Sequence, residues 1–466
     1  MAQPKAALPS PAPRVFDPGN PLPTARAFIE DDFQNQRHRT LLHHGGQFYS
    51  WNGICYQVME SRTISAMLYK YLEPASQSVR KNEWKPFAPT AKKVREVVRA
   101  LEAETHLPTN VIAIPAWLGS HRHSRPDARE IIACSNGLLH LPTLKLLPST
   151  PAFFSTNALS FPYDPGAPEP ARWLKFLGEL WPSDPESIST LQEIFGYFLV
   201  PGTRQQKIFL IIGPKRSGKG TIGRVLRGLL GQNNVCAPTL ASFSQNFGLQ
   251  PLIGKQLAII SDARLSPRPD QQVIAERLLS ISGEDALTID RKYLPAWTGQ
   301  LFCRILVLTN VLPRISDPSG AFASRFIVLR LTESFYGRED QTLTDSLLCE
   351  LPGILNWATE GWQRLRERGH FVQPTSATGQ AQKLQDLGSP IEAFIRDRCV
   401  TGHGRTVVIA KLFAEYKSWC AERDFEAPPD VQTFGSLLRE VQSEIEAKQR
   451  RIGGKPIWHY IGIGLR

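Results

Sequence analysis

The sequence has no apolar run long enough to cross a bilayer, because its longest hydrophobic stretches, such as residues 208–212, are only as long as a strand. Prolines interrupt the opening residues, MAQPKAALPSPAPR, where a secretory signal would need a continuous apolar segment. We therefore expect a soluble cytoplasmic protein with no membrane partner. Residues 1–30 are expected to form a disordered tail.

Clustered metal ligands are also missing from the sequence. The seven cysteines are scattered and no two form a CxxC pair, which favours reduced thiols and argues against a zinc site. His121 and His123 lie close together, but no partner ligand lies at a useful spacing. We therefore expect no structural metal in this chain.

Acidic residues are outnumbered by basic ones. The chain carries 54 lysines and arginines against 43 aspartates and glutamates, which gives a net charge of +11. An excess of this size favours a polyanionic partner, although the basic residues are spread along the chain. Charge alone therefore suggests nucleic acid without establishing it.

A length of 466 residues exceeds one ordinary hydrophobic core, so several domains are expected. Two hairpin signals, at Asn52 and at Asn136, each followed by glycine, flank two stretches of helical periodicity. These patterns predict a small α+β domain over residues 31–150. A segment rich in Pro, Ser and Ala, residues 148–170, follows it as a connector.

The remaining sequence predicts three further parts. A helical pattern over residues 165–205 forms a compact collar. Apolar strand-like runs then alternate with helix-like runs within residues 206–370, which indicates an α/β core with a parallel sheet. Residues 388–466 show three helical stretches followed by two short strands around Gly453 and Gly454, the outline of a winged helix.

The segment IFLIIGPKRSGKGT has the form of a phosphate-binding P-loop, with a strand directly before Gly213 and a helix directly after Thr221. Gly213 and Gly218 let backbone N–H groups close around phosphate, and Lys219 neutralises the β- and γ-phosphates. Gly220 replaces the usual Ser or Thr after the lysine, and the hydroxyl comes one residue later, at Thr221, so the group that touches magnesium stays open. The residues assigned to nucleotide binding are Gly213, Pro214, Lys215, Arg216, Ser217, Gly218, Lys219, Gly220 and Thr221.

Polar residues stand at the ends of the later strands. Asp262 ends a second apolar strand, where a P-loop ATPase needs an acid to hold magnesium or to polarise the attacking water. Asn310 follows a third strand and could orient that water, although asparagine also simply starts turns. Arg325 precedes a fourth strand, where its guanidinium could reach a neighbouring subunit's nucleotide, although an arginine at such a position is more often a surface residue. Glu284 and Asp285 are either helpers of this chemistry or turn residues.

Together, the motifs GPKRSGKGT, IISDA, SGEDALTIDRKY, LVLTN and PSGAFASRF resemble those of superfamily 3 helicases, specifically the phage/plasmid primase-helicase family, in order and spacing. The likeness spans residues 130–400 and implies an AAA+ type ATPase core that uses ATP and Mg²⁺. Because an arginine finger acts between subunits, it also implies a homo-oligomeric ring, a hexamer. The roles that the resemblance assigns are nucleotide and magnesium binding by Lys219 and Thr221, the Walker B acid at Asp262, sensor 1 at Asn310 and the arginine finger at Arg325.

Members of this family grip DNA with a hairpin between the acidic strand and sensor 1. The stretch LTIDRKYLPAWTGQ occupies that interval, so the resemblance makes Arg291, Lys292 and Tyr293 candidates for contact with single-stranded DNA in a central channel. An ordinary solvated turn is the alternative.

The expected winged helix offers a second DNA surface. Its third helix, residues 433–441, would be the recognition helix, and basic residues surround the wing. Such cations position a protein on phosphates without reading sequence, and many winged helices bind protein instead. The DNA-binding candidates in this part are Arg439, Arg450 and Arg451.

These features predict an ATP-dependent replicative DNA helicase of a phage, plasmid or integrated mobile element, which unwinds duplex DNA as a ring that translocates on one strand. An ATP-switched origin-binding initiator without processive unwinding would use the same motifs. A small-molecule phosphotransferase would share the Gly-Lys-Gly-Thr loop, but no acceptor site is visible. Priming is not expected, because the residues before the collar contain no pair of carboxylates with a nearby histidine to hold catalytic metals.

Overall fold

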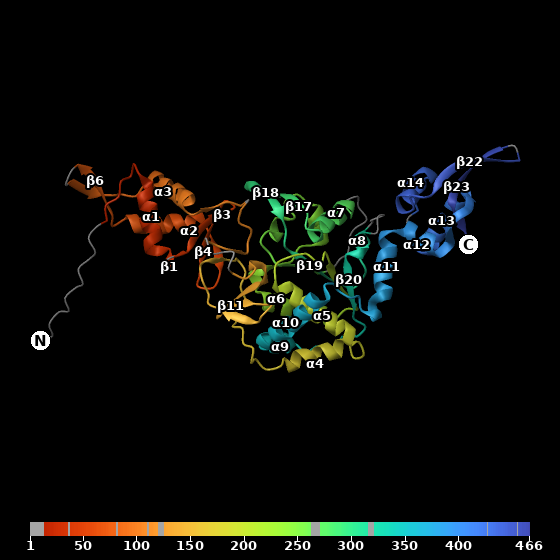
Figure 1. The fold of residues 1–466 in the computed structure, drawn as a ribbon, viewed down its shortest axis with the longest axis horizontal. Helices are drawn as coiled ribbons and strands as arrows, with labels where there is room; N and C mark the ends of the chain where they lie inside the picture. The colour runs from red at the N-terminus through yellow and green to blue at the C-terminus, as the bar shows by residue number, and fades with distance from the viewer. Residues whose placement is uncertain are drawn as a thin grey trace. The chain divides into compact units, whose positions relative to one another are not determined.

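The computed structural model describes residues 14–35, 38–80, 83–109, 111–119, 125–261, 271–315, 321–425, 427–453 and 455–466 (Figure 1). The chain divides into two compact units, Met1–Tyr163 and Asp164–Arg466. Within the described ranges, no helix is both long and apolar enough to cross a membrane.

The first unit packs helices against small sheets that are antiparallel except where β3 pairs with β8. Phe28, Leu68 and Val97, one from each of its helices, are buried in a common core. The helices are α1 (Pro21–Asp32), α2 (Ser61–Leu72) and α3 (Ala91–Glu104). The strands are β1 (Gln34–Asn35), β2 (His38–Arg39), β3 (Leu41–His44), β4 (Gln47–Trp51), β5 (Tyr56–Met59), β6 (Ser76–Arg80), β7 (Glu83–Pro86), β8 (His106–Leu107), β9 (Ala116–Trp117), β10 (Ile131–Cys134), β11 (Gly137–His140), β12 (Lys145–Leu147) and β13 (Phe153–Phe154).

The prediction of a disordered tail over residues 1–30 is wrong for its second half. Helix α1 begins at Pro21, a position where the missing N–H of proline costs the helix nothing. Phe28 is fully buried and Ile29 is 3% exposed. The prolines before residue 24 make the sequence pattern of this helix look like a disordered segment. Packing against α3 stabilises the helix more than the helix propensity of its residues does.

The second unit is built on a five-stranded sheet. Its strands are β14 (Ile208–Ile212), β15 (Val235–Cys236), β16 (Leu257–Ser261), β19 (Arg304–Thr309) and β20 (Phe326–Arg330). They are all parallel, in the order β15-β16-β19-β14-β20, as the alternating pattern of the sequence predicts. Ile212 pairs with Thr309, and Ile208 pairs with Phe326. Residues that follow β14 and β19 therefore share one edge of the sheet, and the residue that precedes β20 lies at the opposite edge.

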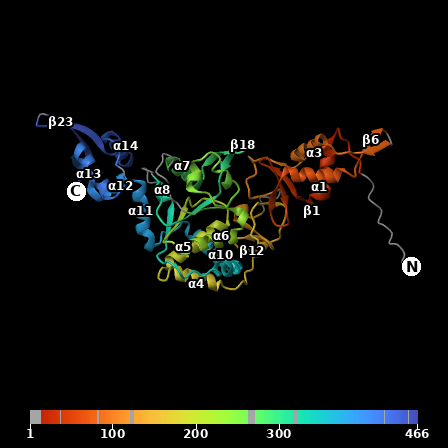
Figure 2. The same ribbon diagram turned by 180° about the vertical axis from the view of Figure 1, so that it is seen from behind.

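Helices cover both faces of this sheet (Figures 1 and 2). On one face, Leu278 of α7 packs with Leu210 of β14. On the other face, Phe209 of β14 contacts Phe198 of α5, with ring centroids 5.2 Å apart. The helices of this core are α4 (Ala171–Leu180), α5 (Pro185–Leu199), α6 (Lys219–Leu230), α7 (Gln271–Ser282), α8 (Ala321–Ser324), α9 (Leu343–Leu348), α10 (Leu351–Arg368) and α11 (Thr378–Gly388). An antiparallel hairpin of β17 (Ala286–Arg291) and β18 (Leu294–Gln300) follows α7.

A buried carboxylate ties α5 to α10. Glu193 of α5 is 2% exposed and accepts hydrogen bonds from Arg364 Nε at 2.8 Å and from Arg368 Nη1 at 3.0 Å. Gly361 of α10 lies against the backbone of α5 at Gln192, where a Cβ atom would come within 2.3 Å of the carbonyl oxygen. The helices predicted as a collar are therefore packed tightly onto the rest of the core.

Replacing Glu193 with alanine should lower the free energy of unfolding by about 2–3 kcal/mol, because two partly buried guanidinium groups lose their counter-charge. Urea denaturation followed by tryptophan fluorescence would measure the change. Glu367→Ala removes an exposed carboxylate from α10 and should change stability by less than about 0.5 kcal/mol. Equal effects of the two substitutions would contradict a stabilising role for the buried carboxylate.

The end of the chain forms its own hydrophobic core around Phe394, Trp419 and Phe434. Its elements are α12 (Pro390–Arg398), β21 (Cys399–Val408), α13 (Ile409–Glu422), α14 (Val431–Val441), β22 (Glu446–Ile452) and β23 (Lys455–Leu465), with sheet order β21-β23-β22. The sequence predicted the three helices and the final two strands but not β21. Gly402 and Gly404 lie within this strand and weaken its sequence pattern. The register of its pairing with β23 shifts between Thr401 and Thr406, the interval that contains both glycines.

Candidate nucleotide-binding site

The loop between β14 and α6 is built for close approach of its backbone. A Cβ atom at Gly213 would lie 2.7 Å from Leu331 Cβ and 2.9 Å from Leu331 O, so only glycine fits there. Gly218 has φ +85° and packs against Leu180 of α4, so its conformation and its surroundings both disfavour a side chain. The loop therefore follows the strand–loop–helix geometry that the sequence predicts, and α6 begins at Lys219.

Lys219 lies across the loop rather than in solvent. Its Nζ donates hydrogen bonds to Gly213 O at 2.8 Å, to Pro214 O at 2.6 Å and to Ser217 Oγ at 3.0 Å. Burial lowers the pKa of Lys219 from its usual value, because the charged form loses hydration. A phosphate at this loop would meet an ammonium group that is already partly stripped of water.

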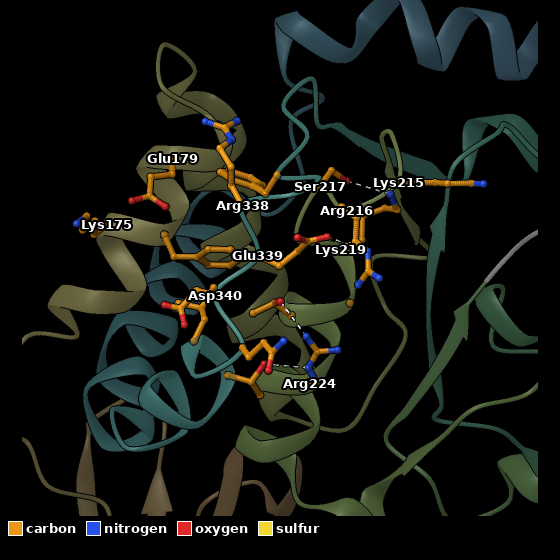
Figure 3. Close-up of a pocket in the computed structure, with 18 of the residues that line it drawn as sticks. Lys175, Glu179, Lys215, Arg216, Ser217, Lys219, Arg224, Arg338, Glu339 and Asp340 are labelled. Carbon is orange, nitrogen blue, oxygen red and sulfur yellow. Dashed lines mark hydrogen bonds and ion pairs between the residues drawn. The ribbon is translucent and has the colours of Figure 1, made fainter.

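A cavity of about 700 Å³ opens above the loop (Figure 3). It is formed by the loop, α4, α6 and the segment that follows β20. Of the described residues that line it, seven are cationic and three acidic. Two of the acids are paired with arginines, Glu339 with Arg216 and Asp340 with Arg172, which leaves an excess of positive charge. The charged lining residues are Arg172, Lys175, Glu179, Lys215, Arg216, Lys219, Arg224, Arg338, Glu339 and Asp340.

The size and charge of this cavity fit a nucleoside triphosphate, since glycine backbone, a desolvated lysine and arginines converge on one space. Thr221 also lines the cavity and offers a hydroxyl oxygen, the hard kind of ligand that Mg²⁺ prefers. Arg224 Nη2 donates to this oxygen at 3.0 Å, while Arg224 Nε donates to Thr344 Oγ1 at 3.0 Å. One lone pair of the Thr221 oxygen is thereby used, and a metal would take the other.

The remaining residues assigned to ATP chemistry divide between the two edges of the sheet. Asn310 follows β19 and lines the cavity, and Gly213 N donates to Thr309 O at 3.2 Å, so Asn310 stands beside the loop. Arg325 precedes β20 and therefore lies at the opposite edge, where its Nη1 donates to Gln206 Oε1 at 2.5 Å. Asp262 lies outside the described residues.

Glu284 and Asp285 are not at the cavity edge of the sheet. They stand between α7 and β17, and the neighbouring Gly283 lies close to the Arg325 guanidinium. Glu284 has φ +67°, and its Oε1 accepts hydrogen bonds from Thr203 N and Thr203 Oγ1, both at 3.2 Å. Its carboxylate is therefore engaged in the turn.

The residues proposed to contact DNA lie at the tip of the β17–β18 hairpin, on helix α14 and on strand β22. Lys292 and Tyr293 join β17 to β18, and Tyr293 is 91% exposed with Lys292 Nζ 5.2 Å from the centre of its ring. Arg291 Nε donates to Pro295 O at 2.8 Å within the same turn. The other three candidates are Arg439 on α14 and Arg450 and Arg451 on β22, all exposed.

Several cavity residues could not be found from the sequence. Arg224 had a weak signal, since it follows Thr221 by three positions and so shares its face of α6. Arg172 and Arg338 had none, because α4 and the segment after β20 are far from the loop in sequence and meet it only in the fold. Phe335 N donates to Arg216 O at 2.9 Å, which holds that segment to the loop.

Comparison with known families agrees with this site. Residues 28–182 match the family described as D5 N terminal like, and residues 211–325 match a family of unknown function, DUF5906. The chain belongs to the D5-type primase-helicase family. The two matched segments span more than half of the chain, and the second runs from β14 to Arg325. Membership confirms the resemblance seen in the motifs and implies a helicase-type enzyme that uses a nucleoside triphosphate and binds DNA.

The chain is also similar in fold to the C-terminal region of NrS-1. One apo structure of that region (305–718) is 14% identical, with a TM-score of 0.52, over 95% of this chain and 99% of that chain. Another apo structure is 13% identical, with a TM-score of 0.50, over 96% of this chain and 100% of that chain. At these identities the likeness concerns the fold, a mixed α/β architecture.

Proposed function

We propose that this D5-type protein is an ATP-dependent replicative DNA helicase of a phage, plasmid or integrated mobile element, which works as a ring on one DNA strand. The observation that carries the proposal is the separation of Lys219 and Arg325 at opposite edges of one parallel sheet. An arginine in that position lies at the other edge of the sheet from its own cavity, so we expect it to complete the nucleotide site of a neighbouring copy. Closure of such head-to-tail contacts gives a ring, which we expect to be a hexamer.

Domain roles follow from this proposal. Residues 206–370 form the AAA+ type motor, which uses ATP and Mg²⁺ with Thr221 and Asp262 at the metal and Asn310 as sensor 1. Residues 165–205 form its collar. The last part, residues 388–466, acts as a winged helix that holds DNA phosphates through its exposed basic residues.

The β17–β18 hairpin is the element that grips the strand. Its tip exposes a cation beside an aromatic ring, the combination that binds phosphate and stacks on bases without reading sequence. The backbone N–H of Lys292 donates to Gln250 Oε1 at 3.0 Å, which fixes the tip to the body of the core. Hydrolysis would then move these tips along one strand.

Lys292→Ala should reduce the increase in ATP turnover caused by single-stranded DNA about tenfold, because the tip loses its phosphate contact. Turnover without DNA should be unchanged, since Lys292 is not among the residues that line the cavity. Phosphate release with and without an oligonucleotide would measure both values. Lys145→Ala, an exposed lysine of the first unit, should behave as the wild type. Full DNA stimulation in Lys292→Ala would rule out the grip assigned to this tip.

Strand displacement on a forked duplex tests the proposed function directly. The wild type should separate the fork in the presence of ATP, and its ATP turnover should rise with single-stranded DNA. An origin-binding initiator would show the stimulated turnover without displacement. A phosphotransferase would show neither.

A further inference from the structure

The base of the β17–β18 hairpin, where the two strands join the core, lies at Glu284. Glu284 stands two positions before β17, and its carbonyl oxygen accepts a hydrogen bond from the side chain of Gln300, the last residue of β18, at 2.7 Å. Helix α7 ends immediately before this turn, and its packing against β17 and β19 fixes the turn to the core. A displacement of the hairpin legs would therefore be felt at the backbone of Glu284.

The side chain of Glu284 reaches from the hairpin base to the loop between α5 and β14. Both hydrogen bonds to its Oε1 come from Thr203, one from the backbone and one from the hydroxyl, at 3.2 Å each. Thr203 is 3% exposed and Glu284 is half-buried, so the bonds are partly shielded from water. Thr203 O in turn accepts from Gln206 N at 2.6 Å, which closes a tight turn.

This turn holds Arg325. The guanidinium Nη1 donates to Gln206 Oε1 at 2.5 Å and to Gln206 O at 3.4 Å. The carbonyl of Arg325 accepts from Ile208 N at 2.8 Å, so the backbone of the arginine is fixed to β14 while its side chain is set by Gln206. The reach of the guanidinium therefore depends on where the turn at Thr203 places Gln206.

Both connecting residues have backbone conformations that L-amino acids rarely adopt. Gln206 has φ +51° and Glu284 has φ +67°, and neither is glycine. Strain of this kind persists only where the surrounding contacts impose it, and it is concentrated at functional positions. The bond between Thr203 and Glu284 is the contact that joins the two strained turns.

We propose that Thr203, Gln206 and Glu284 are positioning residues that connect the DNA-gripping hairpin to Arg325. DNA at the Lys292 tip shifts the hairpin base, Glu284 transmits the shift to Thr203, and Gln206 then sets how far Arg325 extends toward the neighbouring subunit's nucleotide. The inference rests on the proposed function and assigns it the path through which DNA stimulates hydrolysis.

Glu284→Ala tests this connection. We expect the ratio of ATP turnover with DNA to turnover without DNA to fall at least about fivefold, the lower range of measured couplings between sites. The KM for ATP and the Kd for a fluorescent oligonucleotide should stay within about twofold of the wild type, because neither binding surface includes Glu284. Glu284→Gln should retain the ratio, since the amide oxygen can accept the same two bonds.

Two further variants separate transmission from loss of structure. Thr203→Val removes one of the two bonds at nearly constant volume and should lower the ratio about two- to threefold. Glu276→Ala removes an exposed carboxylate of α7 and should behave as the wild type. Circular dichroism would show whether Glu284→Ala folds. If it does not fold, Thr203→Val becomes the test, and a ratio of stimulated to basal turnover equal to that of the wild type in Thr203→Val would overturn the proposal.

The proposal is also overturned if Glu284→Ala keeps the wild-type ratio, or if it loses basal and DNA-stimulated turnover to the same extent. Failure of the proposed function looks different. In that case the wild-type protein itself would show no stimulation of ATP turnover by DNA, and the connection would have nothing to transmit.

Discussion

Replacing Lys219 with alanine is expected to lower ATP turnover by about 10²–10³-fold and to abolish strand displacement. The ammonium group is the cation that the loop holds over its own carbonyls, at 2.6–3.0 Å from three oxygens, and it would neutralise developing charge on the β- and γ-phosphates. The fold should persist, because the loss of a few hydrogen bonds at the surface of the cavity costs only about 1–2 kcal/mol.

Phosphate release and a thermal melt would measure these two effects of Lys219→Ala. Lys383→Ala removes an exposed lysine of α11 and should leave turnover unchanged. If Lys219→Ala kept strand displacement, the motor assignment would be lost. If it unfolded the protein, the fall in turnover would carry no information about the phosphates.

Mixing two inactive proteins, Lys219→Ala and Arg325→Ala, is expected to restore ATP turnover. Alone, Arg325→Ala should lose about 10³-fold, the smaller of the effects measured for arginine fingers. In a randomly mixed ring, about a quarter of the interfaces pair an intact Lys219 with an intact Arg325, so turnover should return to about a quarter of the wild-type value. An arginine that served its own subunit would give no recovery, because neither chain carries both residues.

Native mass spectrometry of the mixture would confirm that subunits have exchanged before turnover is measured. Lys219→Ala mixed with a protein that carries both substitutions provides the control and should stay inactive, since no interface then has an intact Lys219. Exchange without recovery in the first mixture would show that the site is not shared between subunits.

Local sequence was sufficient for the nucleotide loop. Strand, loop and helix are consecutive between residues 208 and 230, so their geometry depends on glycine conformations and on a helix start that the residues themselves encode. The same is true of the central strands, whose apolar runs are buried on both faces of a parallel sheet. The hairpin at Lys292 was expected from the family resemblance alone, which implies such an element between the acidic strand and sensor 1, and the structure has an antiparallel hairpin there.

The prediction from local sequence failed for two segments whose secondary structure depends on packing with distant parts of the chain. Helix α1 was concealed by prolines and is stabilised by contact with α3. Strand β21 contains Gly402 and Gly404, which weaken its strand pattern, and it forms by pairing with β23, from Cys399 with Leu465 to Val408 with His459. Neither segment has a pattern strong enough to define it without its partner.

By itself, the sequence determined the P-loop from Gly213 to Thr221, the order of the strands along the chain and the family to which the motifs belong. Only the tertiary structure decided which residues from distant parts of the chain lie together. It places Asn310 beside the loop and Arg325 at the far edge, and it brings Arg172 and Arg338 to the cavity. It also joins Thr203 to Glu284, 81 residues apart. The reason is that contacts of this kind depend on the strand order of a folded sheet, which no local pattern of side chains encodes.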